Sequence, residues 1–205
     1  MENRRRVVSA LRVSAVLVTG FALGWMIYHR SPSKPVHAAS LKPDKERHVA
    51  PDFALKDADG RTVRLADYKG RVLLLDFWAT WCGPCKIEIP WFMDFERKHK
   101  DQGFSVLGVS MDDDGWDTVK PFVNEVGINY RIVMGNDSTA DKFGGIEALP
   151  TTFLIDREGK IAAVHVGLAN KSDIENAIEE LLQTPANGAG HSNGVSLPGE
   201  FVGAR

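Results

Sequence analysis

The chain has 205 residues, of which 43% are hydrophobic and 25% charged, a composition that suits one folded domain with appendages. The formal net charge is −2, so a nucleic-acid partner, which usually requires a basic excess, is not expected. Only two cysteines are present, three positions apart, which excludes a framework of structural disulfides.

The first 30 residues are predicted to anchor the chain in a membrane. Residues 13–28 form an uncharged run of 16 residues, somewhat short of the roughly 20 that a full span needs. Four arginines precede this run, and positive charge stays on the cytoplasmic side of a membrane. The pattern therefore predicts a single-pass signal anchor over residues 1–30, with everything after it outside the cytoplasm. A signal peptide cleaved near Ala38 is the alternative.

Two further segments flank the predicted domain. Residues 31–46 contain three prolines and several lysines, which is typical of a solvated linker. Residues 185–205 are rich in glycine and proline and poor in large apolar residues, so a disordered C-terminal tail is expected. The folded domain is assigned to residues 47–184.

Strands and helices alternate within this domain. Two short strands around the turn at 57–60 predict an N-terminal hairpin. The apolar segment 72–77 predicts a strand buried on both faces, followed by a helix over 83–100. The remaining expected elements are a strand over 104–110, a helix over 116–126, a strand over 130–134, a short helix over 139–143, a hairpin from 151–156 and 161–166, and a last helix with Ser172 as its N-cap. The order predicts an α/β fold whose mixed central sheet has helices on both faces.

The segment Trp81-Cys-Gly-Pro-Cys85 carries the chemistry. A strand ending at 77 and a helix beginning near Cys82 place this cysteine at a helix N-terminus. The helix dipole and the free backbone N–H groups stabilise a thiolate there, so we expect a lowered pKa for Cys82. Gly83 permits a tight turn and Pro84 suits the first helical turn. Cys85, one turn further on, can attack a mixed disulfide formed at Cys82.

Metal binding is a weaker interpretation of the same cysteines. The additional thiolates or histidines that a zinc site requires are absent at the appropriate spacing, so no metal and no bound cofactor are expected. Asp112, Asp113 and Asp114 are interpreted as a solvated loop rather than a cation site.

Two separated motifs resemble the thioredoxin family. Residues 76–86, together with Pro90, resemble its active-site segment, and residues 145–156 with Gly159 resemble the segment that carries its cis-proline. The opening segment 50–53 and the inserted helix around 116–127 are more similar to the membrane-anchored TlpA/ResA branch. The resemblance implies a thioredoxin-like fold with an N-terminal hairpin and an inserted helix and strand.

The resemblance also implies roles for particular residues. Cys82 would be the exposed nucleophile and Cys85 the buried resolving thiol of a Cys82–Cys85 disulfide. Pro150 would form a cis bond facing the cysteines and leave nearby backbone free to pair with a bound client. Further contacts to the client are expected from the residues around these positions, namely Trp81, Gly83, Pro84, Leu149 and Thr151. Trp78 and Trp81 are expected to shield the site and present an apolar face.

Two carboxyl groups are candidates for moving protons. Asp76 interrupts the apolar strand and matches the buried acid of thioredoxins, where burial would raise its pKa. Glu88 lies three residues after Cys85 on the same helical face and matches an active-site glutamate of ResA-like proteins. The sequence does not decide between them.

The function expected from these features is reduction of disulfides in client proteins at the outer face of a bacterial cytoplasmic membrane. The resemblance suggests apocytochrome c or copper-site proteins as clients, and a membrane thiol-electron transporter as the donor. A thiol peroxidase is one alternative, although Thr80 is two residues before Cys82 rather than the three that peroxiredoxins use. A copper-delivery module is the other alternative.

Overall fold

The computed structural model describes residues 41–184. The predicted signal anchor, the first part of the predicted linker and the predicted tail lie outside this range. In chain order the elements are η1 (Asp44–Glu46), β1 (His48–Val49), β2 (Ala54–Asp57), β3 (Thr62–Arg64), η2 (Leu65–Tyr68), β4 (Val72–Trp78), α2 (Gly83–His99), η3 (Lys100–Gln102), β5 (Phe104–Ser110), α3 (Trp116–Val126), β6 (Arg131–Met134), α4 (Asp137–Lys142), β7 (Thr151–Ile155), β8 (Lys160–Val166) and α5 (Lys171–Gln183). No helix within the described range is both long and apolar enough to cross a membrane.

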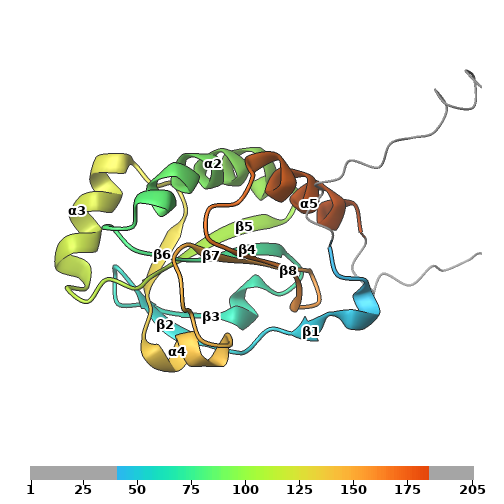
Figure 1. Ribbon diagram of the computed structural model, residues 1–205, viewed down its shortest axis with the longest axis horizontal. Helices are drawn as coiled ribbons and strands as arrows, with labels where there is room; N and C mark the ends of the chain where they lie inside the picture. Colours follow the sequence, from blue (N-terminus) through green and yellow to red (C-terminus); the bar gives the residue numbers. More distant parts are fainter. Residues whose placement is uncertain (1–40, 185–205) are drawn as a thin grey trace, which may run out of the picture. The chain divides into compact units, whose positions relative to one another are not determined.

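The strands form one mixed sheet in the order β1-β8-β7-β4-β5-β6-β2-β3. β4 lies near the middle, parallel to β5 and antiparallel to β7. Every residue of β4 is buried, as its apolar sequence predicts for a strand covered on both faces. α2 and α5 lie over one face of the sheet and α4 lies at the other (Figure 1). The predicted α/β fold, with a mixed sheet and helices on both faces, is confirmed.

Side chains of β4 alternate between two cores because successive residues of a strand point to opposite faces. Val72, Leu74 and Trp78 pack in the core that also holds the apolar faces of α2 and α5. The intervening residues pack in the second core, with Phe143 and the N-terminal hairpin. Asp76 has the same parity as Leu74 and Trp78, so it faces the α2 side. This placement sets up the chemistry of the site.

Both predicted hairpins are present, and each turn is held by a buried aspartate. In the first, the Asp57 carboxylate accepts hydrogen bonds from the backbone N–H groups of Asp59 and Arg61. In the second, Asp156 accepts from the backbone N–H groups two and four residues further along the chain. An aspartate that bonds its own turn in this way fixes the hairpin locally, which is why the sequence pattern predicted both hairpins.

The inserted segment joins the N-terminal hairpin to the rest of the sheet. β6 pairs in parallel with β5 and antiparallel with β2. The hairpin therefore extends the central sheet instead of forming a separate layer. The extra helix α3 connects β5 to β6 and buries Val119 in the core beneath α2.

The beginning and end of the folded unit differ in detail from the predictions. β1 pairs with β8, and Lys42 donates its backbone N–H to the carbonyl of Ala162, so the last residues of the predicted linker contact the sheet. The prediction that Ser172 is the N-cap of α5 is wrong. Asn170 is the cap, and its side chain accepts a hydrogen bond from the Ser172 backbone N–H at 3.0 Å.

Candidate active site

Cys82 and Cys85 form a disulfide at the start of α2, with a Cα–Cα distance of 5.3 Å. Cys82 is the N-cap residue, and its Sγ accepts a hydrogen bond from the Cys85 backbone N–H at 3.2 Å. Gly83 and Pro84 are the first two helical residues, as expected from their backbone preferences. The same N–H group and the helix dipole are available to stabilise a thiolate on Cys82 after reduction.

The burial of the two cysteines corrects one expectation. Cys82 was predicted to be exposed, but in the disulfide it is only 4% exposed, compared with 1% for Cys85. The residues that do reach solvent are its neighbours, since Trp81 is 69% exposed and Gly83 and Pro84 are also exposed. The ring of Trp81 is thus the apolar surface next to the reactive sulfur.

The prediction that Trp78 presents an apolar face to a partner is wrong. It ends β4 on the α2 side and is completely buried, with its ring against Phe122 of α3 at a centroid distance of 5.5 Å. Gly108 on β5 leaves the space that this indole occupies, because a Cβ there would lie 2.9 Å from Trp78 Nε1. Trp78 is therefore part of the core beneath the site.

The Leu149–Pro150 peptide bond is cis, which confirms the expectation from the family motif. The Pro150 carbonyl accepts a hydrogen bond from the Gly167 N–H. Within residues 41–184 the backbone groups of Leu149 form no hydrogen bond, so they remain available to a client strand. Thr151 was expected to contact the client, but its side chain is buried and donates to the Ala148 carbonyl at 2.7 Å. Its hydroxyl therefore shapes the loop.

Asp76 is 1% exposed and faces the helix that carries Cys85. Its Oδ1 accepts a hydrogen bond from the Thr152 hydroxyl at 3.2 Å, from the neighbouring strand β7. Burial, and secondly the charge of Glu88, raise the pKa of Asp76 well above its usual range. Asp76 is therefore a weaker acid than an ordinary aspartate and is a potential proton donor.

Glu88 is also 1% exposed, one turn after Cys85 on α2. Its Oε1 accepts a hydrogen bond from the Ala169 backbone N–H at 2.9 Å, while Oε2 has no partner within the described residues. Burial raises the pKa of Glu88 to about 7. A carboxyl group with a pKa near the working pH can both accept and donate a proton. The structure thus brings both predicted carboxyl groups to the α2 side of β4.

Tyr130 was missed by the sequence analysis. It is buried in the same core as Cys85, and its hydroxyl has no hydrogen-bond partner within the described residues. No sequence motif includes it, so no pattern indicated its position. Burial first, and then the charges of Asp76 and Glu88, raise the pKa of Tyr130 well above its ordinary value. The phenol therefore stays neutral in the electrostatic environment of the two acids.

Asp112 was also missed, because it was assigned to a solvated loop. Its carboxylate is buried and accepts hydrogen bonds from the Thr80 hydroxyl at 2.5 Å, the Thr80 backbone N–H at 3.0 Å and the Ser110 hydroxyl at 2.8 Å. β4 and β5 are parallel neighbours, so the residues that follow them meet at one edge of the sheet. Asp112 thereby fixes the loop that delivers Cys82, and this topological argument could have identified it.

The sheet order, the disulfide at the N-terminus of α2 and the cis Leu149–Pro150 bond define a thioredoxin-like thiol-disulfide oxidoreductase. A sequence model of the AhpC/TSA family matches residues 47–164, more than half of the chain. The chain belongs to this redoxin family.

Named relatives and solved structures agree with this class. The thiol-disulfide oxidoreductase ResA of Geobacillus thermodenitrificans is 33% identical over 181 residues, covering 88% of this chain and 99% of the relative. ResA of Bacillus subtilis is 33% identical over 174 residues, covering 85% and 92%. A thiol:disulfide interchange protein of the thioredoxin family from Chlorobium tepidum superposes with a TM-score of 0.62 at 30% identity, covering 68% of this chain and 99% of that one.

Proposed function

We propose that this oxidoreductase reduces disulfides in client proteins outside the cytoplasm, tethered to a bacterial cytoplasmic membrane by residues 1–30. The observation that carries the chemistry is the position of Cys82 as N-cap of α2, with a backbone N–H directed at its sulfur. The position outside the cytoplasm is supported by the arginines that precede the uncharged run 13–28.

The reaction passes one electron pair to the client. The Cys82 thiolate attacks a client disulfide, which forms a mixed disulfide and releases one client thiolate. The Cys85 thiolate then attacks the Cys82 sulfur. This step forms the Cys82–Cys85 disulfide and releases the second client sulfur as a thiolate, which takes up a proton. The client is reduced and this protein is oxidised, so a thiol donor, proposed to be a membrane electron transporter, must restore the dithiol.

The surroundings of the disulfide support a protein as the substrate. Several large apolar side chains are exposed on the segments that flank it, which is typical of an interaction surface. Trp81 precedes Cys82, Val166 pairs with Thr151 beside the cis-proline, and Leu168 precedes the residue that bonds Glu88. The resemblance to the TlpA/ResA branch supports apocytochrome c and copper-site proteins as clients.

Labelling with a membrane-impermeant maleimide tests both the location and the direction of electron flow. In spheroplasts that express the full chain, we expect most of the protein to be labelled without permeabilisation and without added reductant. The chain has only two cysteines, so the Cys82→Ser/Cys85→Ser double variant gives the background. Labelling that requires permeabilisation would contradict the location, and labelling that requires a reductant would contradict a reductase.

Membership in the AhpC/TSA family favours peroxide reduction as the second candidate. Against it, the Thr80 hydroxyl donates to Asp112 and is therefore not directed at the Cys82 sulfur. A peroxide-consumption assay on the reduced protein separates the candidates, because turnover as fast as that of a disulfide substrate would replace our proposal.

Copper delivery is not proposed. It would require both cysteines as thiolates, whereas Cys82 and Cys85 form a disulfide in this structure.

A further inference from the structure

His99, the last residue of α2, carries a buried imidazole. It is 7% exposed, and neither Nδ1 nor Nε2 has a partner within the described residues. Its ring packs edge-on against Phe104, with centroids 6.1 Å apart. Burying a polar group without a partner costs free energy. A ligand bound to a ring nitrogen would remove this cost, and no other residue between 41 and 184 provides one.

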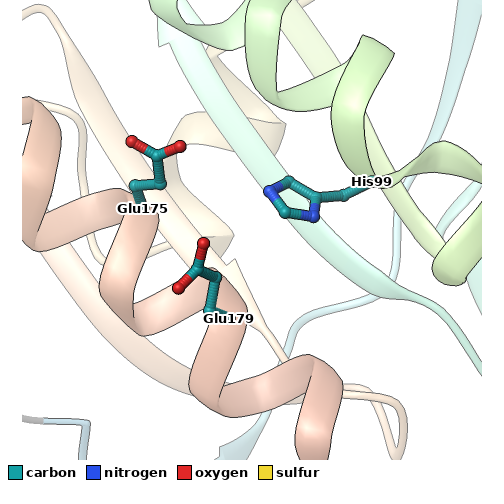
Figure 2. Close-up of side chains that lie close together, drawn as sticks. All are labelled: His99, Glu175 and Glu179. Carbon is teal, nitrogen blue, oxygen red and sulfur yellow. The ribbon is translucent and has the colours of Figure 1, made fainter.

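Two glutamates of α5 lie opposite this ring. Glu175 and Glu179 are one helical turn apart, and their carboxylates lie across from the His99 ring between α2 and α5 (Figure 2). One ligand atom from each of the three residues can be chosen so that all lie within 4.8 Å of one another. Like charges at this helical spacing destabilise a helix. A cation between them would remove that repulsion and also provide a partner for the imidazole.

We propose that His99, Glu175 and Glu179 form a binding site for a zinc-type divalent cation, separate from the cysteines. Imidazole nitrogen together with carboxylate oxygen suits zinc, whereas magnesium and calcium prefer oxygen ligands alone. Zinc bonds such atoms at about 2.0–2.2 Å in a tetrahedron, with the fourth position open to water. Neighbouring ligands in that geometry are roughly 3.4 Å apart, so the glutamate side chains must close inward from their present positions.

Glu179 can make this movement more easily than Glu175, which must give up an ion pair with Lys98. Glu179 is exposed and forms no ion pair with any residue between 41 and 184, and Glu175 is only partly buried. His99, by contrast, is fixed by its burial and by Phe104. A cation site between two helices requires one fixed ligand and others that can close on the ion. The buried imidazole and the two more exposed carboxylates meet this requirement.

Lys98 is the natural competitor for this site. Its Nζ lies 2.6 Å from Glu175 Oε1, where it neutralises one carboxylate in place of a metal ion. The same ammonium lies 3.4 Å from Asp94 Oδ2 and is about half exposed, so it can move to Asp94 when a cation enters. Metal binding would thus exchange one ion pair for another and tie the end of the active-site helix to α5.

No sequence pattern predicts this site. His99 and Glu175 are 76 residues apart, and only the packing of α5 on α2 brings them together. No metal was expected because further thiolates or histidines are absent at zinc spacing from the cysteines, and the proposal departs from that expectation.

Isothermal titration of the untagged full chain with zinc chloride tests the proposal. The protein is kept oxidised so that the Cys82–Cys85 disulfide leaves no thiol to bind zinc. We expect one site per chain, and Glu179→Gln should weaken it at least tenfold. Glu180→Gln is the matched control, since Glu180 is the next residue of α5 and is also exposed, and it should change the affinity less than twofold. Lys98→Met should strengthen binding severalfold because it removes the competing ammonium.

Two checks keep the result specific. The unfolding temperature without zinc should be the same for Glu179→Gln and Glu180→Gln, so that a loss of affinity reports a lost ligand. His99→Phe, which preserves the ring packing on Phe104, should abolish the site. The proposal is overturned if no zinc binds, if both glutamine variants weaken binding equally, or if Lys98→Met leaves the affinity unchanged or lowers it.

Discussion

Cells that express the Cys85→Ser variant should accumulate mixed disulfides between Cys82 and client proteins, whereas the Cys82→Ser variant should accumulate few. The N-terminus of α2 favours the thiolate of Cys82, so this sulfur attacks the client first. Without Cys85 no second thiol is one turn away to release the client. Trapped species are detected on non-reducing gels and identified by mass spectrometry after release with a reductant.

The same pair of variants predicts a loss of turnover. Both should reduce a protein disulfide substrate at least ~100-fold more slowly than the native chain, because a complete cycle requires two sulfurs. No third cysteine is present to substitute for either one. Retention of reductase activity by both variants would show that the exchange does not pass through this pair.

Glu88→Gln should flatten the pH dependence of turnover around neutrality and slow it roughly 100-fold, within the usual contribution of a positioned acid or base. The pKa of Glu88 is raised to about 7 by burial, so its protonation changes within the range in which the enzyme must work. Glu88 lies one helical turn from Cys85, whose thiol must lose a proton before it attacks the mixed disulfide. The measurement is the pH–rate profile of disulfide reduction.

Asp76→Asn is the matched comparison. Asp76 faces the same helix and burial raises its pKa well above the usual range, whereas the pKa of about 7 belongs to Glu88. We therefore expect Asp76→Asn to slow turnover while the inflection near pH 7 persists. The opposite pattern, with the inflection lost in Asp76→Asn and retained in Glu88→Gln, would assign the proton transfer to Asp76.

The stability of the Glu88→Gln variant gives a second measurement of the same group. The unfolded chain releases the Glu88 proton near the ordinary pKa of 4.5, whereas the folded protein holds it to about 7. Between these values the folded state binds the extra proton, so the free energy of unfolding falls as the pH rises, by about 3 kcal/mol in all. Denaturant unfolding across pH 4–8 should show a steeper decline in the native chain than in the variant, in which the raised pKa of Asp76 still contributes.

Features governed by local sequence were predictable. The hairpins around Gly60 and Gly159 follow from turn residues between apolar strands, and the left-handed backbone at both glycines, with φ of 77° and 81°, explains why glycine is needed there. The strand at 72–78 and the helix beginning at Gly83 follow from apolar runs and from the Gly-Pro pair. The cysteine pair could be interpreted because its chemistry depends on the three-residue spacing and on the helix that begins at Gly83, both of which are local features.

Features governed by distant packing were not predictable. The burial of Trp78 depends on Gly108 in the adjacent strand, and the position of Asp112 depends on which strand lies beside β4. The two-residue strand β1 is too short to carry a pattern and exists because β8 offers it an edge. The near-complete burial of Cys82 likewise depends on packing in the core that it shares with Trp78.

The proposed exchange depends above all on the acidity of the Cys82 thiol in the reduced protein. In the Cys85→Ser variant Cys82 is the only thiol, so its alkylation rate by iodoacetamide as a function of pH reports one group. We expect a midpoint clearly below the roughly 8.5 of an ordinary cysteine, because the start of α2 stabilises the thiolate. A midpoint at or above that ordinary value would rule out a helix-stabilised thiolate and with it the proposed exchange.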